Sequence, residues 1–139
     1  MYAITFVLEG FGKDVGREHS NRVLAIYLNA LYETDISYLK AFPNTKRLYE
    51  SGVRYRREPV GVERWQDIPA VLRSGYGDCE DLATFRAAEL TVSGTLAVPS
   101  FRWRTVPERG TMLYHIVVEK ADGSIEDPSA QLGMLDPRG

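Results

Sequence analysis

The segment that decides the fold is SGYGDCEDLATFRAAEL, residues 74–90. It contains Cys79, the single cysteine of the chain, which follows two glycines and lies between Asp78 and Glu80. The pattern predicts a helix from Cys79 to about Val92, with Asp78 as a candidate N-cap. A thiol at a helix N-terminus has a lowered pKa and becomes a nucleophile, whereas a lone cysteine elsewhere is commonly a buried packing residue. The segment therefore poses a choice between a nucleophile and a structural cysteine.

Length and composition exclude several classes of protein. The 139 residues suit one domain, and the net charge of −2 gives no basic footprint for nucleic acid. One cysteine excludes an internal disulfide and a multi-cysteine zinc site. The apolar run at residues 2–8 is too short to span a membrane and has no cleavage site after it. We therefore expect a strand there, no membrane partner and, without a signal peptide, a cytoplasmic location.

The first part of the chain has helical spacing. Residues 19–33 predict a helix with Ser20 as N-cap, and residues 35–42 continue the pattern up to Pro43. We expect a short helix in residues 44–50, an extended segment in 53–58, and a helix between an Asp67 cap and a Gly75 stop.

After residue 94 the period becomes extended. Strands are predicted over residues 98–106, 112–120 and 124–128, with turns at 108–110 and 121–124 and an irregular tail from 131. Helices followed by an antiparallel meander indicate an α+β fold, in which N-terminal helices and the Cys-bearing helix pack on a small antiparallel sheet.

A cysteine nucleophile needs a base and a group that orients the base. His115 lies in an apolar strand, where an imidazole without a partner is costly. The other histidine, His19, has polar neighbours. Asp127 is the candidate orienting group. The alternatives are a structural histidine and a turn aspartate before proline.

The hairpin register decides whether these two side chains meet. Asp127 lies opposite His115 if the turn is centred on Ala121, and opposite Val118 if the turn is two residues long. A slip of one residue reverses the faces, so the register stays open at this point.

These residues resemble a known family. GYGDCEDLA (75–83) followed by YHIVVEKADGSIEDPS (114–129) is similar to the transglutaminase-like cysteine peptidase superfamily, whose core is papain-like, in its bacterial and phage GDCED form. The similar region runs from about residue 65 to 129. The resemblance implies a single transglutaminase-like domain over residues 1–139. It also implies Cys79 as nucleophile, His115 as general base and acid, and Asp127 as the group that orients the imidazole.

Two further sets of residues follow from the resemblance. A bacterial subgroup holds calcium with the acids beside its cysteine, and Asp78 and Glu80 match those positions, although two carboxylates are not a complete calcium site. Papain-like sites also add an upstream Gln or Trp as oxyanion donor beside the backbone N–H of the cysteine, which makes Trp65 and Gln66 candidates. The alternatives are helix capping for the acids, a core position for Trp65 and an exposed position for Gln66.

We therefore expect a thiol-dependent acyl-transfer enzyme with a Cys-His-Asp triad that hydrolyses a peptide or side-chain amide, with no required cofactor. Its partner would be a protein or peptide substrate. The alternative is a catalytically inert module used in assembly or protein binding. Short proteins of this type resemble those of phage and prophage structural clusters, which makes phage structural proteins candidate partners and the virion a second candidate location.

Overall fold

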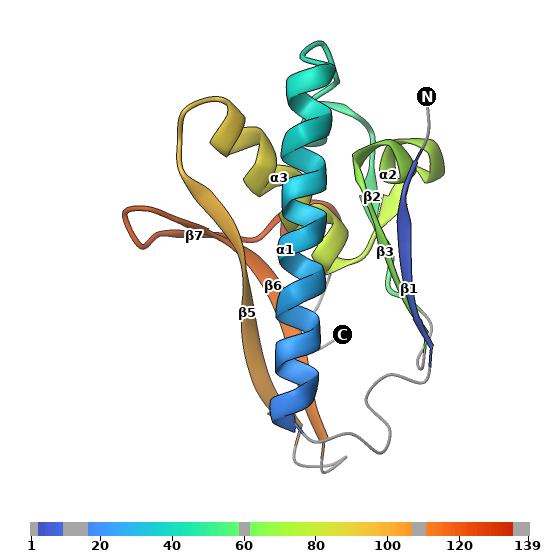
Figure 1. The fold of residues 1–139 in the computed structure, drawn as a ribbon, viewed down its shortest axis with the longest axis vertical. Helices are drawn as coiled ribbons and strands as arrows, with labels where there is room; N and C mark the ends of the chain where they lie inside the picture. Colours follow the sequence, from blue (N-terminus) through green and yellow to red (C-terminus); the bar gives the residue numbers. More distant parts are fainter. Residues whose placement is uncertain (1–2, 10–16, 59–61, 107–110, 135–139) are drawn as a thin grey trace.

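The Cys-bearing helix α3 (Cys79–Val92) lies at the centre of the fold. In the computed structural model, which describes residues 3–9, 17–58, 62–106 and 111–134, α3 packs against the long helix α1 (Arg17–Ala41) and against strands β5 (Ala97–Val106) and β6 (Thr111–Lys120). Figure 1 shows α1 running along the long axis of the molecule, with β5 on one side, β6 passing behind it, and β1 and β3 on the other side. The α+β class is confirmed, as is the packing of this helix on an antiparallel sheet.

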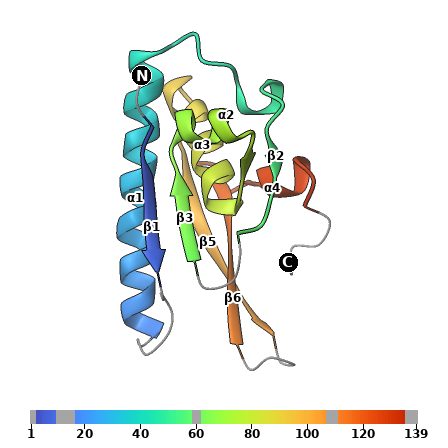
Figure 2. The same ribbon diagram turned by 90° about the vertical axis from the view of Figure 1, so that its right-hand side faces the viewer.

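The strands form three small sheets. β5, β6 and β7 (Ile125–Glu126) form an antiparallel sheet in that order, and β1 (Thr5–Glu9) pairs antiparallel with β3 (Val62–Gln66). β2 (Arg54–Tyr55) and β4 (Tyr76–Gly77) form a short parallel pair. Figure 2 shows the β1–β3 pair on the side that faces the viewer, beside α1 and below α2. The other elements are α2 (Ile68–Ser74), α4 (Pro128–Gln131) and the 3-10 helix η1 (Leu48–Glu50).

Helix α3 is buried on nearly all sides because it separates two hydrophobic clusters. Ala83 and Ala87 face the first cluster, and Leu82 and Phe85 face the second. The first cluster joins α3 to α1, β3, β5 and β6; its buried members are Leu24, Leu28, Leu31, Tyr32, Trp65, Cys79, Ala83, Ala87, Ala97, Ile116 and Val118. The second joins α3 to α2, η1 and α4; its buried members are Leu39, Leu48, Val53, Ile68, Val71, Leu82, Phe85, Ala88 and Leu132.

Local capping fixes the two helices around the cysteine. Asp67 caps α2 by accepting from the Ala70 N–H, and Gly75 ends it with a left-handed φ of 78°. A capping box between Asp78 and Asp81 opens α3. The predicted bounds of both helices are therefore confirmed.

Several predictions need correction. The two predicted helical segments before Pro43 form one continuous helix, so Ser20 lies inside α1 and is not its N-cap. The helix expected in residues 44–50 is reduced to the three residues of η1. Strand β3 and helix α4 are not predicted. The strand expected over residues 124–128 is limited to β7, and α4 ends at Gln131, where the expected irregular tail begins. The turn predicted at residues 108–110 lies outside the described residues.

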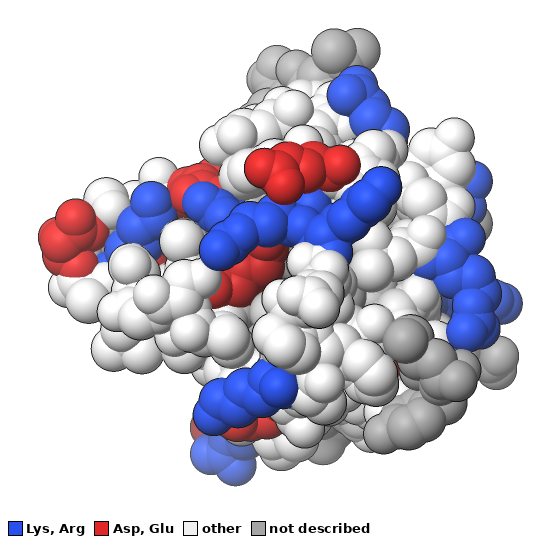
Figure 3. Space-filling model, turned by 90° about the horizontal axis from the view of Figure 1, so that it is seen from above, with Lys and Arg blue, Asp and Glu red and all other residues white. Residues whose placement is uncertain are grey.

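Figure 3 shows the molecule from above, looking at the end where α1 terminates. Basic and acidic side chains are interspersed on this face. None of the described helices combines the length and the apolar character needed to cross a membrane.

Candidate functional site

His115 and Asp127 form a bonded pair. His115 Nε2 lies 2.9 Å from Asp127 Oδ2, with both side chains partly buried. Asp127 is also the N-cap of α4, where its Oδ1 accepts from the Ala130 N–H. One carboxylate oxygen is thus held by a helix start and the other meets the imidazole. The bond at Nε2 leaves Nδ1 as the ring nitrogen available to a thiol.

The register that creates this pair differs from both alternatives raised by the sequence. Val118 pairs with Glu126 and Glu119 with Ile125, so continuing by one residue places Asp127 opposite Val117. Val117 and His115 are two residues apart and share a face of β6. Asp127 is therefore a diagonal neighbour of His115, a separation that long side chains bridge.

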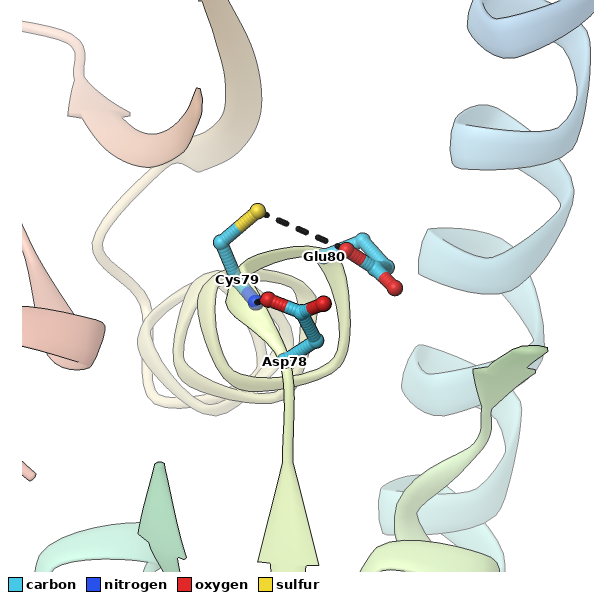
Figure 4. A group of neighbouring side chains, drawn as sticks. All are labelled: Asp78, Cys79 and Glu80. Atoms are coloured by element: carbon cyan, nitrogen blue, oxygen red, sulfur yellow. Dashed lines mark hydrogen bonds between the residues drawn. The ribbon is translucent and has the colours of Figure 1, made fainter. Parts of the chain in front are cut away.

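Cys79 lies beside strand β6, and its thiol is turned toward Glu80. The residue is 6% exposed, and its Sγ donates to Glu80 Oε2 at 3.4 Å (Figure 4). Burial raises the pKa of the thiol well above its usual range, and the charges of Glu80 and Asp78 raise it further. The Ile116 backbone N–H bonds to the sulfur and lowers the pKa only in part.

The thiol lies against the backbone of the strand that carries the imidazole. Ile116, whose N–H meets the sulfur, directly follows His115 in β6. Among the described residues, no hydrogen bond joins Cys79 to His115. The structure thus brings Cys79 to the strand that carries the His115–Asp127 pair and leaves the thiol in its protonated, Glu80-bonded form.

Asp78 acts mainly as a cap. Its Oδ1 accepts from the Cys79 N–H at 2.7 Å and its Oδ2 accepts from the Glu58 N–H at 3.0 Å. The Tyr55 hydroxyl also bonds to this carboxylate. The Cys79 N–H, one of the candidate oxyanion donors, is therefore already bonded to Asp78.

Glu80 is the least satisfied polar group of the site. It is 1% exposed, and its Oε1 has no hydrogen-bond partner among the described residues. Burial raises the pKa of Glu80 well above its usual range, and the charges of Asp78, Asp81 and Glu63 add to the shift. Ligand atoms of Asp78, Cys79 and Glu80 lie within 4.8 Å of one another, which is the spacing of a cation site (Figure 4).

Trp65 and Gln66 both lie close to the site on β3, with their donors bonded to carboxylates. Trp65 is fully buried, and its indole N–H donates to Glu63 Oε2 at 3.2 Å. Gln66 Nε2 donates to Asp81 Oδ2 at 3.2 Å and to the Tyr76 carbonyl at 3.3 Å. Their role as oxyanion donors stays a prediction, and it would require these bonds to be exchanged.

Sequence reasoning missed Asp81 and Glu63. Asp81 is buried and accepts from the Gln66 N–H at 2.7 Å and the Asp78 N–H at 3.1 Å, so it fastens β3 to the start of α3. The three-residue spacing from Asp78 to Asp81 is a capping-box signal that was available in the sequence. Glu63 accepts from Trp65 and from the Tyr114 hydroxyl, and only the unpredicted strand β3 reveals its position.

No family model, curated protein or solved structure matches this chain.

Proposed function

We propose that this protein is a thiol-dependent acyl-transfer enzyme that hydrolyses a peptide or side-chain amide bond. The observation that carries the proposal is the 2.9 Å bond between His115 Nε2 and Asp127 Oδ2. His115 is followed in β6 by Ile116, whose backbone N–H bonds to Cys79 Sγ. A catalytic triad needs a nucleophile, a base and a carboxylate that orients the base. Here a cysteine at a helix start would be the nucleophile, and a histidine and an aspartate of the adjacent hairpin would be the base and the orienting carboxylate. The same arrangement supports a papain-like, transglutaminase-like core.

The reaction assigns one task to each group. His115 Nδ1 takes the thiol proton, and the Cys79 sulfur attacks the carbonyl carbon of the amide. The imidazolium then gives its proton to the leaving nitrogen, the C–N bond breaks and a thioester forms. Water attacks the thioester with His115 again as base, and the acid and the free thiol are released. An amine in place of water would give a crosslink, but water needs no second binding site.

The resting arrangement must change before the first step. The thiol donates to Glu80, so the sulfur has to turn from Glu80 toward Nδ1 of His115. Catalytic hydrogen bonds commonly tighten only in the substrate complex, and rotation about the single side-chain torsion of cysteine is sufficient to redirect its sulfur.

Calcium is a proposed modulator of the same site. The buried Glu80 Oε1 beside Asp78 fits a cation, because an added positive charge would compensate an oxygen that no donor of the described residues reaches. Asp78 and Glu80 would hold the ion, and its charge would oppose the negative field that raises the pKa of Cys79.

A second candidate is an inert module used in assembly or protein binding. The observation that favours it is the resting thiol itself, which is nearly buried and bonded to Glu80 rather than to His115. In that case Cys79 is a packing residue of the first core cluster.

One labelling experiment separates the two candidates. Cys79 is the only cysteine, so intact mass after iodoacetamide treatment reports this thiol alone. We would measure the labelling rate between about pH 5 and pH 9 for the wild type, His115→Ala, Asp127→Asn and the matched control His19→Ala. His19 is an exposed histidine on α1, so its removal tests for a general effect of losing an imidazole.

The enzyme proposal expects the wild type and His19→Ala to react at least about tenfold faster than His115→Ala between about pH 6 and pH 8, with Asp127→Asn between them. Equal rates in the wild type and His115→Ala at every pH would show that His115 does not activate the thiol of the free protein, and would favour the binding module.

A further inference from the structure

A cleft of about 440 Å³ lies between the β1–β3 pair and the β2–β4 pair. It is not lined by Cys79, His115 or Asp127, so it is distinct from the triad. Among its lining residues are Arg56, Glu58, Arg64, Gln66, Tyr76 and Gly77.

The β1–β3 pair places Thr5, Arg64 and Gln66 on the side that faces the cleft. Thr5 pairs with Gln66 and Val7 with Arg64, so these residues share one face of the ribbon, while Trp65 lies on the other face, in the core. Gln66 is held in place by Asp81 and by the Tyr76 carbonyl, which fastens β3 to β4 along the cleft.

The two arginines of the cleft are not neutralised by contact. In the part of the chain that the structure describes, neither guanidinium group forms a salt bridge or a side-chain hydrogen bond. Arg56 is held over the Tyr76 ring, 4.5 Å from its centroid, so a ring that also lines the cleft positions this guanidinium. Glu58 is the acidic residue that lines the cleft, and it stands within electrostatic range of both arginines. Asp78 and Glu63 act on Glu58 in turn, and Asp81 is bonded to Gln66 behind the cleft wall.

The cleft adjoins the start of the helix that carries the thiol. Gly77 lines it and is two residues before Cys79, so their Cα atoms are at most about 7.6 Å apart. Gly77 also lies against the first turn of α3, where an added Cβ would come within 2.9 Å of Leu82 Cδ2. The backbone of the cleft is thus packed directly on the start of the Cys-bearing helix.

From these observations we infer that the cleft binds a carboxylate group of a peptide, and that it selects substrates for the neighbouring thiol. The side chains that line the cleft carry two guanidinium groups and one carboxyl group, and the fork of donors on an arginine matches carboxylate geometry. That the bound peptide is a substrate rests on the proposed function. That the cleft binds its carboxylate does not depend on the proposed function. The carboxylate belongs either to an acidic side chain or to a chain terminus.

The test is an NMR titration of the isotope-labelled full chain with three peptides. Acetyl-Ala-Glu-Ala-Ala-amide offers an acidic side chain, acetyl-Ala-Gln-Ala-Ala with a free C-terminus offers a terminal carboxylate, and acetyl-Ala-Gln-Ala-Ala-amide offers neither. We expect saturable shifts of the Gln66, Tyr76 and Gly77 amides with one or both carboxylate peptides and none with the neutral one. The peptide that binds shows whether the carboxylate comes from an acidic side chain or from a chain terminus.

Arginine variants show whether the contact is direct. Arg56→Gln and Arg64→Gln should each weaken binding at least about tenfold. Arg73→Gln removes the same charge from the exposed end of α2, outside the residues that line the cleft, and should change binding much less.

Results of two kinds would overturn the inference. One is the absence of shifts with both carboxylate peptides, or unchanged binding in both cleft variants. The other is stronger binding of inorganic phosphate than of either peptide at the same amides, which would show a site for dianions. Repeating the titration on Cys79→Ala separates the two proposals, because carboxylate binding should persist there even if the labelling experiment rejects the enzyme.

Discussion

Arg86 of α3 is bonded to Glu126 of β7, with Nε 2.7 Å from Oε2. Glu126 directly precedes Asp127, so this pair joins the helix that begins at Cys79 to the chain segment that holds the carboxylate bonded to His115. Tyr49 and Lys120 also bond to Glu126. Burial raises the pKa of Glu126, but the bonds from Arg86 and its other partners outweigh burial and leave the pKa lowered.

Arg86→Met should therefore destabilise the protein and loosen Asp127. We expect a loss of about 1–3 kcal/mol in the free energy of unfolding, because Glu126 loses a charged hydrogen-bond partner in a partly buried place. Arg22→Met breaks the exposed Arg22–Glu18 pair on α1 and should cost at most about 0.5 kcal/mol. Chemical denaturation measures both.

The same variant gives a second readout for a positioning role. The labelling rate of Cys79 in folded Arg86→Met should fall toward that of His115→Ala if Arg86 helps to hold Asp127. A rate equal to that of the wild type, in a protein that is still destabilised, would show that Arg86 is purely structural.

Glu80→Gln should make the Cys79 thiol more reactive. The Glu80 charge lies 3.4 Å from the sulfur and is one of the causes that raise the pKa of the thiol, after burial. Removing this charge moves the labelling profile to lower pH, and one pH unit corresponds to about tenfold more thiolate below the pKa. Glu33→Gln, an exposed change on α1, controls for net charge. An unshifted profile would mean that Glu80 carries no charge over the pH range tested.

Asp35 gives a prediction for the pH dependence of stability. It is buried on α1, its Oδ1 accepts from the Ile68 N–H, and burial raises its pKa well above the usual range. With the folded pKa above the unfolded one, its contribution to stability is complete below the unfolded pKa of about 3.9 and is lost as the pH rises through the folded pKa.

Asp35→Asn keeps an acceptor for Ile68 and removes the buried charge. The melting temperature of Asp35→Asn minus that of the wild type should therefore increase as the pH is raised from about 4 to about 8. Glu33→Gln, which removes an exposed carboxyl group from the same helix, should show no comparable trend. A constant difference for Asp35→Asn across this range would contradict the proposed burial cost.

Calcium should stabilise the protein if Asp78 and Glu80 hold it. At 100 times the dissociation constant, one bound ion adds about 2.7 kcal/mol to the free energy of unfolding, which a thermal melt detects. Glu80→Gln should abolish the shift while leaving the Asp78 cap intact. Magnesium serves as the control ion, since it demands stricter geometry. No shift at millimolar calcium in the wild type would remove this proposal.

Local chemistry explains which parts of the fold were predictable. The Asp67 cap and Gly75 stop define α2, and Asp78 defines the start of α3, because capping residues act on backbone groups within one turn. The β5–β6 pair follows from alternating residues. Ser20 was misleading as a cap because the long helix begins before it, and helix ends depend on packing as well as on local preference.

The sequence by itself determined that Cys79 begins a helix and that His115 and Asp127 lie on neighbouring chain segments, since period and capping are local properties. Only the tertiary structure decided what these groups touch. It places Asp127 diagonally across from His115, turns the thiol to Glu80, and engages Trp65 and Gln66 with carboxylates. Partner choice depends on strand register and on burial, which arise only when segments distant in the sequence pack together.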